Sequence, residues 1–159
     1  MSMFESDGFQ WRETYFVLFD SGKRPTLQKI IATLQELGGQ FRLNSSQGDD
    51  DGMFESLTLL APDDFAAIDV SYVEGDEVSE QGAALKEEMG PGDPEDAPKL
   101  KRLPRCDARF DLMHFEQLVE GADDEPEEML DPSALLLVME TLMKLTGGIG
   151  VDPQSGSLM

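Results

Sequence analysis

The sequence predicts a single α+β domain over residues 1–159, with a mixed or antiparallel sheet and helices packed mainly on one of its faces. The chain has 159 residues, of which 40% are hydrophobic and 28% charged, which is typical of a globular protein with one core. Short segments with the alternation of strands are interleaved with segments whose apolar residues recur at helical spacing. Together these two observations predict the fold class.

The first half of the chain predicts a strand, a helix and then three strands. Residues 14–20 are rich in aromatic and β-branched side chains and are followed by Ser-Gly, as expected of a buried strand. Pro25 suits the first turn of a helix whose apolar residues share one face as far as Leu37, where two glycines follow. The further strands are expected at 41–44, 54–61 and 67–73, with a turn-rich loop at 45–52.

The second half predicts two helices and two strands. A weaker helix spans 77–89, and Gly82 interrupts it at a cost of about 1 kcal/mol relative to Ala. A long strand is expected at 106–116, and a short one at 149–152 with the possibility of a returning edge after it. Between them, a helix from Pro132 to about residue 145 is apolar on nearly all sides, so the fold or a second subunit must cover it.

The order of these elements contains a βαββαβ core. This order resembles that of ferredoxin-like folds, with an added C-terminal helix and strand. The resemblance concerns the fold alone and implies no activity.

Negative charge is concentrated in a few segments. The formal net charge is −21, and residues 49–51, 87–96 and 120–131 hold 15 of the 33 acids without a Lys or Arg, so the rest of the chain carries −6. Acidic connectors are therefore expected at about 87–98 and 119–131, either as solvated linkers or as a docking surface for a basic protein. The candidate interaction residues are Asp123, Asp124, Glu125, Glu127 and Glu128.

Composition also argues against several classes of protein. The first ten residues contain no Lys or Arg and no apolar run, and the longest apolar run, 134–139, is far too short to span a bilayer, so a cytoplasmic location without membrane contact is expected. One cysteine cannot form a disulfide framework within the chain. The small basic cluster at 99–105 has no interleaved aromatic residue, so nucleic acid is not an expected partner.

The sequence contains no recognisable catalytic motif and predicts no cofactor or metal. Cys106 and His114 would lie about 26 Å apart on one strand, too far to act as nucleophile and base. The consecutive aspartates 49–51 lack the alternating spacing of a calcium loop. Asp107, Arg109 and Asp111 alternate on one strand face, which favours a cross-strand salt ladder.

Three hypotheses of function follow. The first is a noncatalytic protein-interaction module that binds a basic protein through its acidic segments or a sheet edge. The second is an enzyme or small-ligand-binding protein with a site assembled across strands, for which the candidate residues are Arg109, Asp111 and His114. The third is a self-assembling subunit that forms a homo-oligomer through its apolar final helix.

Overall fold

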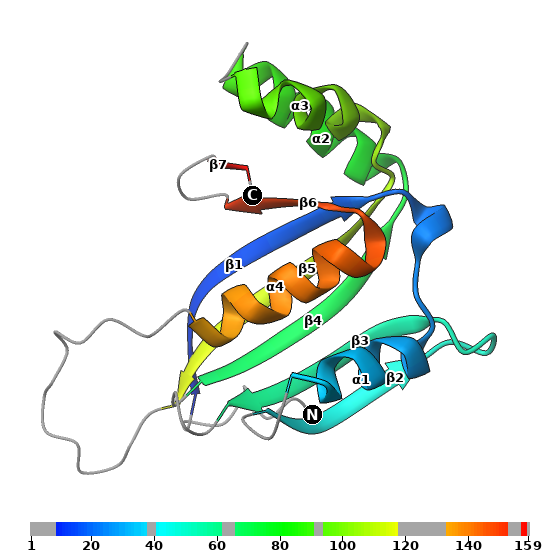
Figure 1. Cartoon of the computed structure of the whole chain (residues 1–159), viewed down its shortest axis with the longest axis vertical. Helices are drawn as coiled ribbons and strands as arrows, with labels where there is room; N and C mark the ends of the chain where they lie inside the picture. Colours follow the sequence, from blue (N-terminus) through cyan, green and yellow to red (C-terminus); the bar gives the residue numbers. More distant parts are fainter. Residues whose placement is uncertain are drawn as a thin grey trace, which may run out of the picture.

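The protein has an α+β fold built on one seven-stranded sheet (Figure 1). The computed structural model describes residues 9–37, 41–61, 66–90, 94–117, 133–152 and 157–158. The strand order is β2-β3-β4-β5-β1-β6-β7, and every neighbouring pair is antiparallel. Within these residues no helix is both long enough and apolar enough to cross a membrane.

The elements follow the predicted order closely. The strands are β1 (Phe9–Phe19), β2 (Arg42–Gly48), β3 (Phe54–Ala61), β4 (Ala66–Glu74), β5 (Ala108–Gln117), β6 (Ile149–Asp152) and β7 (Ser157–Leu158). The helices are α1 (Leu27–Gln35), α2 (Asp76–Met89), α3 (Ala97–Arg102) and α4 (Ser133–Thr146), with short 3₁₀ turns η2 (Ser21–Lys23), η4 (Pro94–Asp96) and η5 (Leu103–Arg105).

One predicted loop is wrong. The turn-rich loop expected at 45–52 is a strand as far as Gly48, and only the residues after it form the turn to β3. The continuation of the predicted strand beyond residue 44 was missed because residues 44–47 are all polar, as an exposed strand at the edge of a sheet allows. Register shifts after Leu43 and after Gln47 interrupt its pairing with β3.

The sheet is wider than that of a ferredoxin-like fold. In a split βαβ unit another strand lies between the two strands that the helix connects. Here β1 and β2 flank α1 in the chain, but three strands, β5, β4 and β3, lie between them in the sheet. The two strands beyond the single one of a split βαβ unit are β4 and β5, which the chain adds between β3 and β1.

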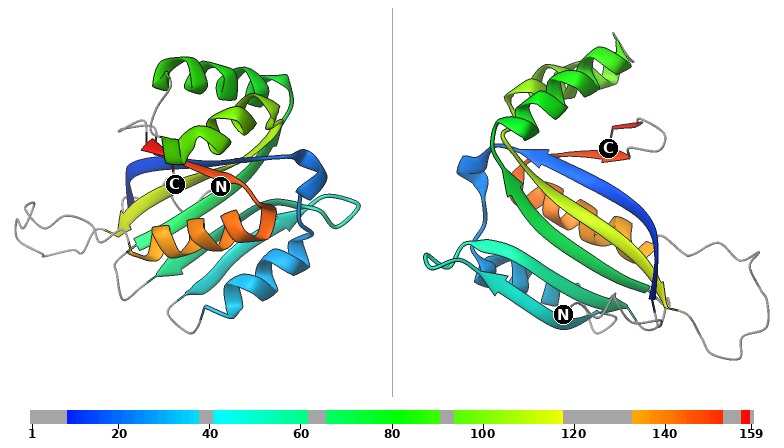
Figure 2. Two further views of the ribbon diagram at one scale, coloured as in Figure 1. Left: turned by 45° about the horizontal axis from the view of Figure 1, so that its top comes forward. Right: turned by 180° about the vertical axis from the view of Figure 1, so that it is seen from behind.

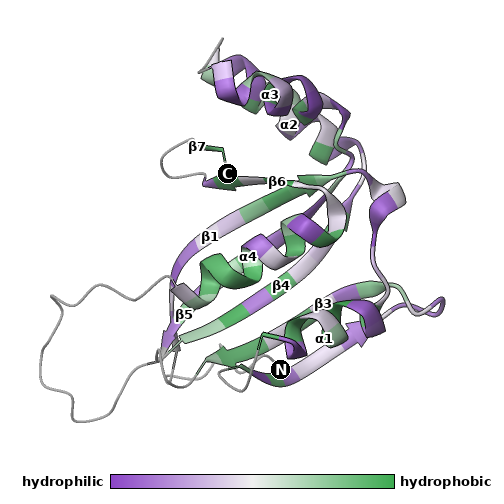
Figure 3. Ribbon diagram, in the orientation of Figure 1, coloured by the Kyte–Doolittle hydropathy of each residue, from purple (hydrophilic) through white to green (hydrophobic). Residues whose placement is uncertain are grey.

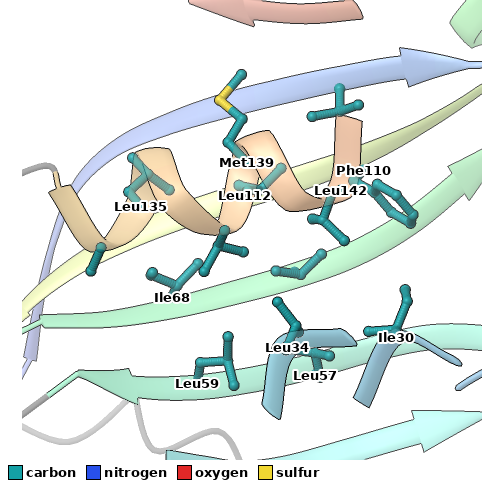
Figure 4. Packing of buried hydrophobic residues seen from close by; sticks show 14 of the residues in the cluster. Ile30, Leu34, Leu57, Leu59, Ile68, Phe110, Leu112, Leu135, Met139 and Leu142 are labelled. Carbon is teal, nitrogen blue, oxygen red and sulfur yellow. The ribbon is translucent and has the colours of Figure 1, made fainter. Parts of the chain in front are cut away.

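The main core lies on the front face of the sheet, which α1 and α4 cover (Figures 1 and 4). Thr26 caps α1 by accepting a hydrogen bond from the Lys29 amide at 3.1 Å. Gly147, with φ 69°, follows α4 in the left-handed conformation expected after a helix. The side chains that meet between helices and sheet include Leu34, Leu57, Phe110, Leu135, Met139 and Leu142.

A smaller core lies on the back face, beneath α2 and α3. Leu18 belongs to it, whereas its neighbours Val17 and Phe19 point into the main core, as the alternation of a strand requires. The helices therefore divide, with α1 and α4 on the front and α2 with α3 at one end of the back, as Figure 2 shows from two sides. Gly82 allows α2 to lie against the backbone of η5, because a Cβ at this position would lie 2.0 Å from the Leu103 carbonyl oxygen.

The described parts of the acidic connector expected at 87–98 are largely helical. Residues 87–89 complete α2, and residues 94–98 form η4 and the start of α3. The connector expected at 119–131 lies outside the described residues.

Candidate functional site

The predicted ligand-site residues do not converge. Arg109 lies on the back face, where its Nε donates to Asp111 Oδ1 at 2.7 Å and its Nη1 to Gln81 Oε1 at 2.7 Å. The ion pair thus joins two residues of one strand, and a hydrogen bond links Arg109 to α2, so the predicted cross-strand salt ladder is wrong. His114 lies on the front face, because its strand neighbours Phe110 and Leu112 pack in the main core.

His114 and Cys106 are both buried in separate surroundings. The His114 side chain is 0% exposed, and its Nδ1 lies 3.2 Å from Glu13 Oε1. Cys106 precedes β5 and packs in the back-face core, so the strand that was predicted to carry both residues carries His114 alone. Burial is the main cause that raises the pKa of the Cys106 thiol to about 11, so the thiol is protonated at neutral pH.

The aspartates 49–51 build a tight turn. Asp49 Oδ1 accepts from the amides of Asp51 and Met53, each at 2.9 Å, and its Oδ2 lies 3.3 Å from Arg24 Nη1. Among the described residues, no group of three or more His, Cys, Asp or Glu side chains is placed to hold a metal ion. Asp49 holds the turn through these hydrogen bonds and this ion pair, while Asp50 and Asp51 are exposed.

Arg24 ties this turn to the sheet. Its Nε and Nη2 donate to the Phe54 carbonyl at 3.0 and 2.7 Å, and its guanidinium lies 4.1 Å above the Tyr72 ring. Burial, followed by the negative charge of Glu74, raises the pKa of Tyr72 to about 12 despite the nearby guanidinium. Tyr72 therefore serves as a neutral stacking partner.

The acidic interaction candidates Asp123, Asp124, Glu125, Glu127 and Glu128 lie outside the described residues. The apolar helix α4, on which the self-assembly hypothesis depends, is covered by the front face along the side that carries Leu135, Val138, Met139 and Leu142. Its remaining apolar side chains, such as Leu136 and Leu137, are half-buried.

The feature that stands out is an open edge at β2. Of the described strands, β2 pairs with β3 alone and begins the sheet order. Residues 42–47 are all exposed. A strand edge of this kind presents backbone N–H and C=O groups on which a further strand can pair.

An apolar groove lies beside this edge. It has a volume of about 90 Å³ and is lined by Ile31, Leu34, Gln35, Phe41, Leu43 and Leu59. The residues come from α1, from β2 with its approach, and from β3, where Leu59 pairs with Leu43. Leu43 is 40% exposed, and the other large apolar side chain exposed in the described part of the chain is Trp11 on β1. We call β2 and this groove the edge site.

The sequence predicted the strand at 41–44 but not its place at the edge of the sheet. Phe41 and Leu43 alternate with polar residues and are followed by four polar residues in a row. Such a change from half-apolar to fully polar within one strand is a signal of a sheet edge. The groove itself depends on how α1 crosses β2, which no local pattern reveals.

A scan against protein-family models and searches of curated proteins and of solved structures found no match to this chain.

Proposed function

We propose that this protein is a noncatalytic interaction module that binds an extended segment of a basic partner protein along β2. The observation that carries the proposal is the coincidence of an exposed strand edge with an apolar groove at the edge site. In strand addition, backbone hydrogen bonds supply affinity, and pockets for alternate side chains supply specificity. The edge site offers both.

Charge favours a partner other than a second copy. Each chain carries a net charge of −21, so two copies repel each other, whereas a basic protein is attracted over a distance comparable with the Debye length. All twelve Lys and Arg residues lie in the described part of the chain, which nevertheless holds 21 acids. The attraction to a basic partner should therefore weaken as salt rises.

The proposal can be tested with peptides selected from a random display library on the full chain. Selected peptides are expected to contain Lys or Arg, and in NMR titration to shift the amide signals of residues 42–48. Leu43→Ser should weaken binding at least tenfold, whereas Trp11→Ser, which removes the other exposed apolar side chain, should leave it unchanged.

Two results would overturn the proposal. One is that no peptide is selected under low salt. The other is that selected peptides shift signals elsewhere and bind Leu43→Ser as well as the wild type. If sedimentation instead shows a dimer that Leu43→Ser disrupts, the edge site joins two copies, and the basic partner is excluded as its occupant.

A further inference from the structure

The edge site is asymmetric along its length, and this asymmetry defines a recognition pattern for its ligand. Resting on the proposed function, we infer that the partner segment carries one aliphatic side chain in the groove and basic residues about five to seven positions away, beside Asp50 and Asp51. Figure 1 shows the two ends of β2, with the turn to β3 extending away from α1.

The volume of the groove selects the anchor. A cavity of about 150 Å³ lined by aliphatic and aromatic side chains accommodates benzene. The groove here measures about 90 Å³, and its described lining contains no charged side chain. A single Leu, Ile, Val or Met side chain therefore matches the volume of the groove better than the larger ring system of a tryptophan.

The charges along the edge select the position of the basic residues. Arg42 is exposed next to Leu43, so a Lys or Arg beside the anchor would face a like charge. Asp50 and Asp51 are exposed just beyond the other end of β2, while Asp49 is already held by Arg24. Positive charge on the ligand is therefore favoured at the turn and disfavoured at the groove.

The spacing follows from strand geometry. Leu43 and Gly48 are five residues apart, which corresponds to about 17 Å of extended chain. A partner strand that pairs along β2 with its anchor at Leu43 reaches the turn after a similar number of residues. The number of residues between the anchor and the basic residues is the same whether the added strand runs parallel or antiparallel to β2. Only their order along the ligand is reversed.

The experiment uses three synthetic peptides that carry the same net charge. The first has a leucine and two lysines about six positions away, with Thr and Ser between them. The second has the lysines moved next to the leucine, and the third has tryptophan in place of the leucine. Each is also made with its sequence reversed. Dissociation constants for the full chain are measured by fluorescence anisotropy at low salt.

The first peptide, in one of its directions, should bind about threefold to tenfold more tightly than the second, as expected of two exposed charge pairs. The third should bind more weakly than the first. Asp50→Asn with Asp51→Asn should abolish the difference between the first two peptides. Glu87→Gln with Glu88→Gln, which removes the same charge from α2, should preserve it.

The outcomes separate this inference from the proposed function. If the first two peptides bind equally, or if the α2 variant loses the preference as fully as the turn variant, the recognition pattern is refuted. The proposed function then stands only if binding still depends on Leu43. Binding that is indifferent to Leu43→Ser, or absent for every peptide, overturns both.

Discussion

The sheet has an open edge at β2 and a closed edge at β6 and β7, and the two edges differ in how far their residues are buried. At one edge, β2 is exposed over residues 42–47 and is bordered by a groove. At the other, Ile149 and Val151 of β6 are buried against the back-face core, and β7 pairs beyond them. Figure 3 shows the mostly hydrophilic α3 above the closed edge and the mostly hydrophobic α4 across the middle of the sheet.

This difference indicates where the stability of the protein resides and supports the proposed place of binding. Burial of apolar surface stabilises the closed edge, because side chains of α2, α3 and β6 form one buried cluster with Leu18 there. The open edge contributes little to the core, and its residues 42–47 are exposed. A protein that binds through strand addition needs such an edge, whereas one whose sheet serves only as a scaffold is expected to protect it.

The largest expected effect is at the closed edge. Ile149→Ala should lower the free energy of unfolding by about 2–5 kcal/mol, because Ile149 is 1% exposed. Leu43→Ala at the open edge should lower it by about 1 kcal/mol or less. Urea unfolding followed by circular dichroism measures both. Equal losses would show that the open edge is part of the stabilising core.

Arg24 holds in place the hairpin that β2 and β3 form at the open edge, which we call the open hairpin. Arg24→Ala should lower the free energy of unfolding by about 1.5–3 kcal/mol, because the guanidinium hydrogen-bonds the Phe54 carbonyl and pairs with Asp49. Hydrogen exchange should accelerate in β2 and β3 more than in β6. Arg42→Ala removes an exposed arginine of β2 and is the control, so it should have little effect. Uniform acceleration across the sheet would contradict a local anchor.

Gly82 brings α2 against the backbone of η5 near the closed edge. Gly82→Ala should destabilise the protein by about 1–3 kcal/mol, because the added Cβ would overlap the Leu103 carbonyl oxygen although alanine is the better helix former. Ala84→Gly, at an exposed position of the same helix, should cost about 1 kcal/mol. A stabilised Gly82→Ala variant would mean that the two segments separate easily.

Gly82 also illustrates what the sequence could reveal. Helical spacing and strand alternation predicted nearly every element, since each depends on neighbours within a few residues. From the sequence, Gly82 was seen only as a residue that weakens the helix. The backbone that approaches it lies 21 positions further along the chain, so no local pattern reveals the contact. The short helix α3 was hidden for another reason: its Pro and Lys residues gave the composition of a connector.

The candidate site was harder to predict than the fold. Cys106, Arg109 and His114 attracted attention because of their chemistry, yet the structure uses them as buried or paired side chains. Leu43 and Ile31 carry no chemical signature, and their importance arises only when α1 crosses the edge strand. A site made of shape and an exposed strand edge leaves little trace in a single sequence.

The smallest expected effect tests the boundary where the open hairpin joins the rest of the sheet. There, Thr58 of β3 donates to Asp69 Oδ1 of β4 at 2.9 Å. Burial raises the pKa of Asp69 above its ordinary value of 3.8, although this hydrogen bond acts in the opposite direction. The folded state therefore binds the proton more tightly than the unfolded state, and the contribution of Asp69 to stability declines as pH rises from 3.8 through the raised pKa.

Asp69→Asn stays neutral and can still accept the hydrogen bond from Thr58. Its free energy of unfolding should match the wild type at low pH and exceed it slightly at neutral pH. Asp107→Asn provides the opposite sign, because two hydrogen bonds from Ser21 lower the pKa of Asp107 in the folded state. This variant should be less stable than the wild type at neutral pH, with the deficit vanishing as pH falls through that lowered pKa. If both differences ran in the same direction with pH, burial of Asp69 at the boundary of the open hairpin would be disproved.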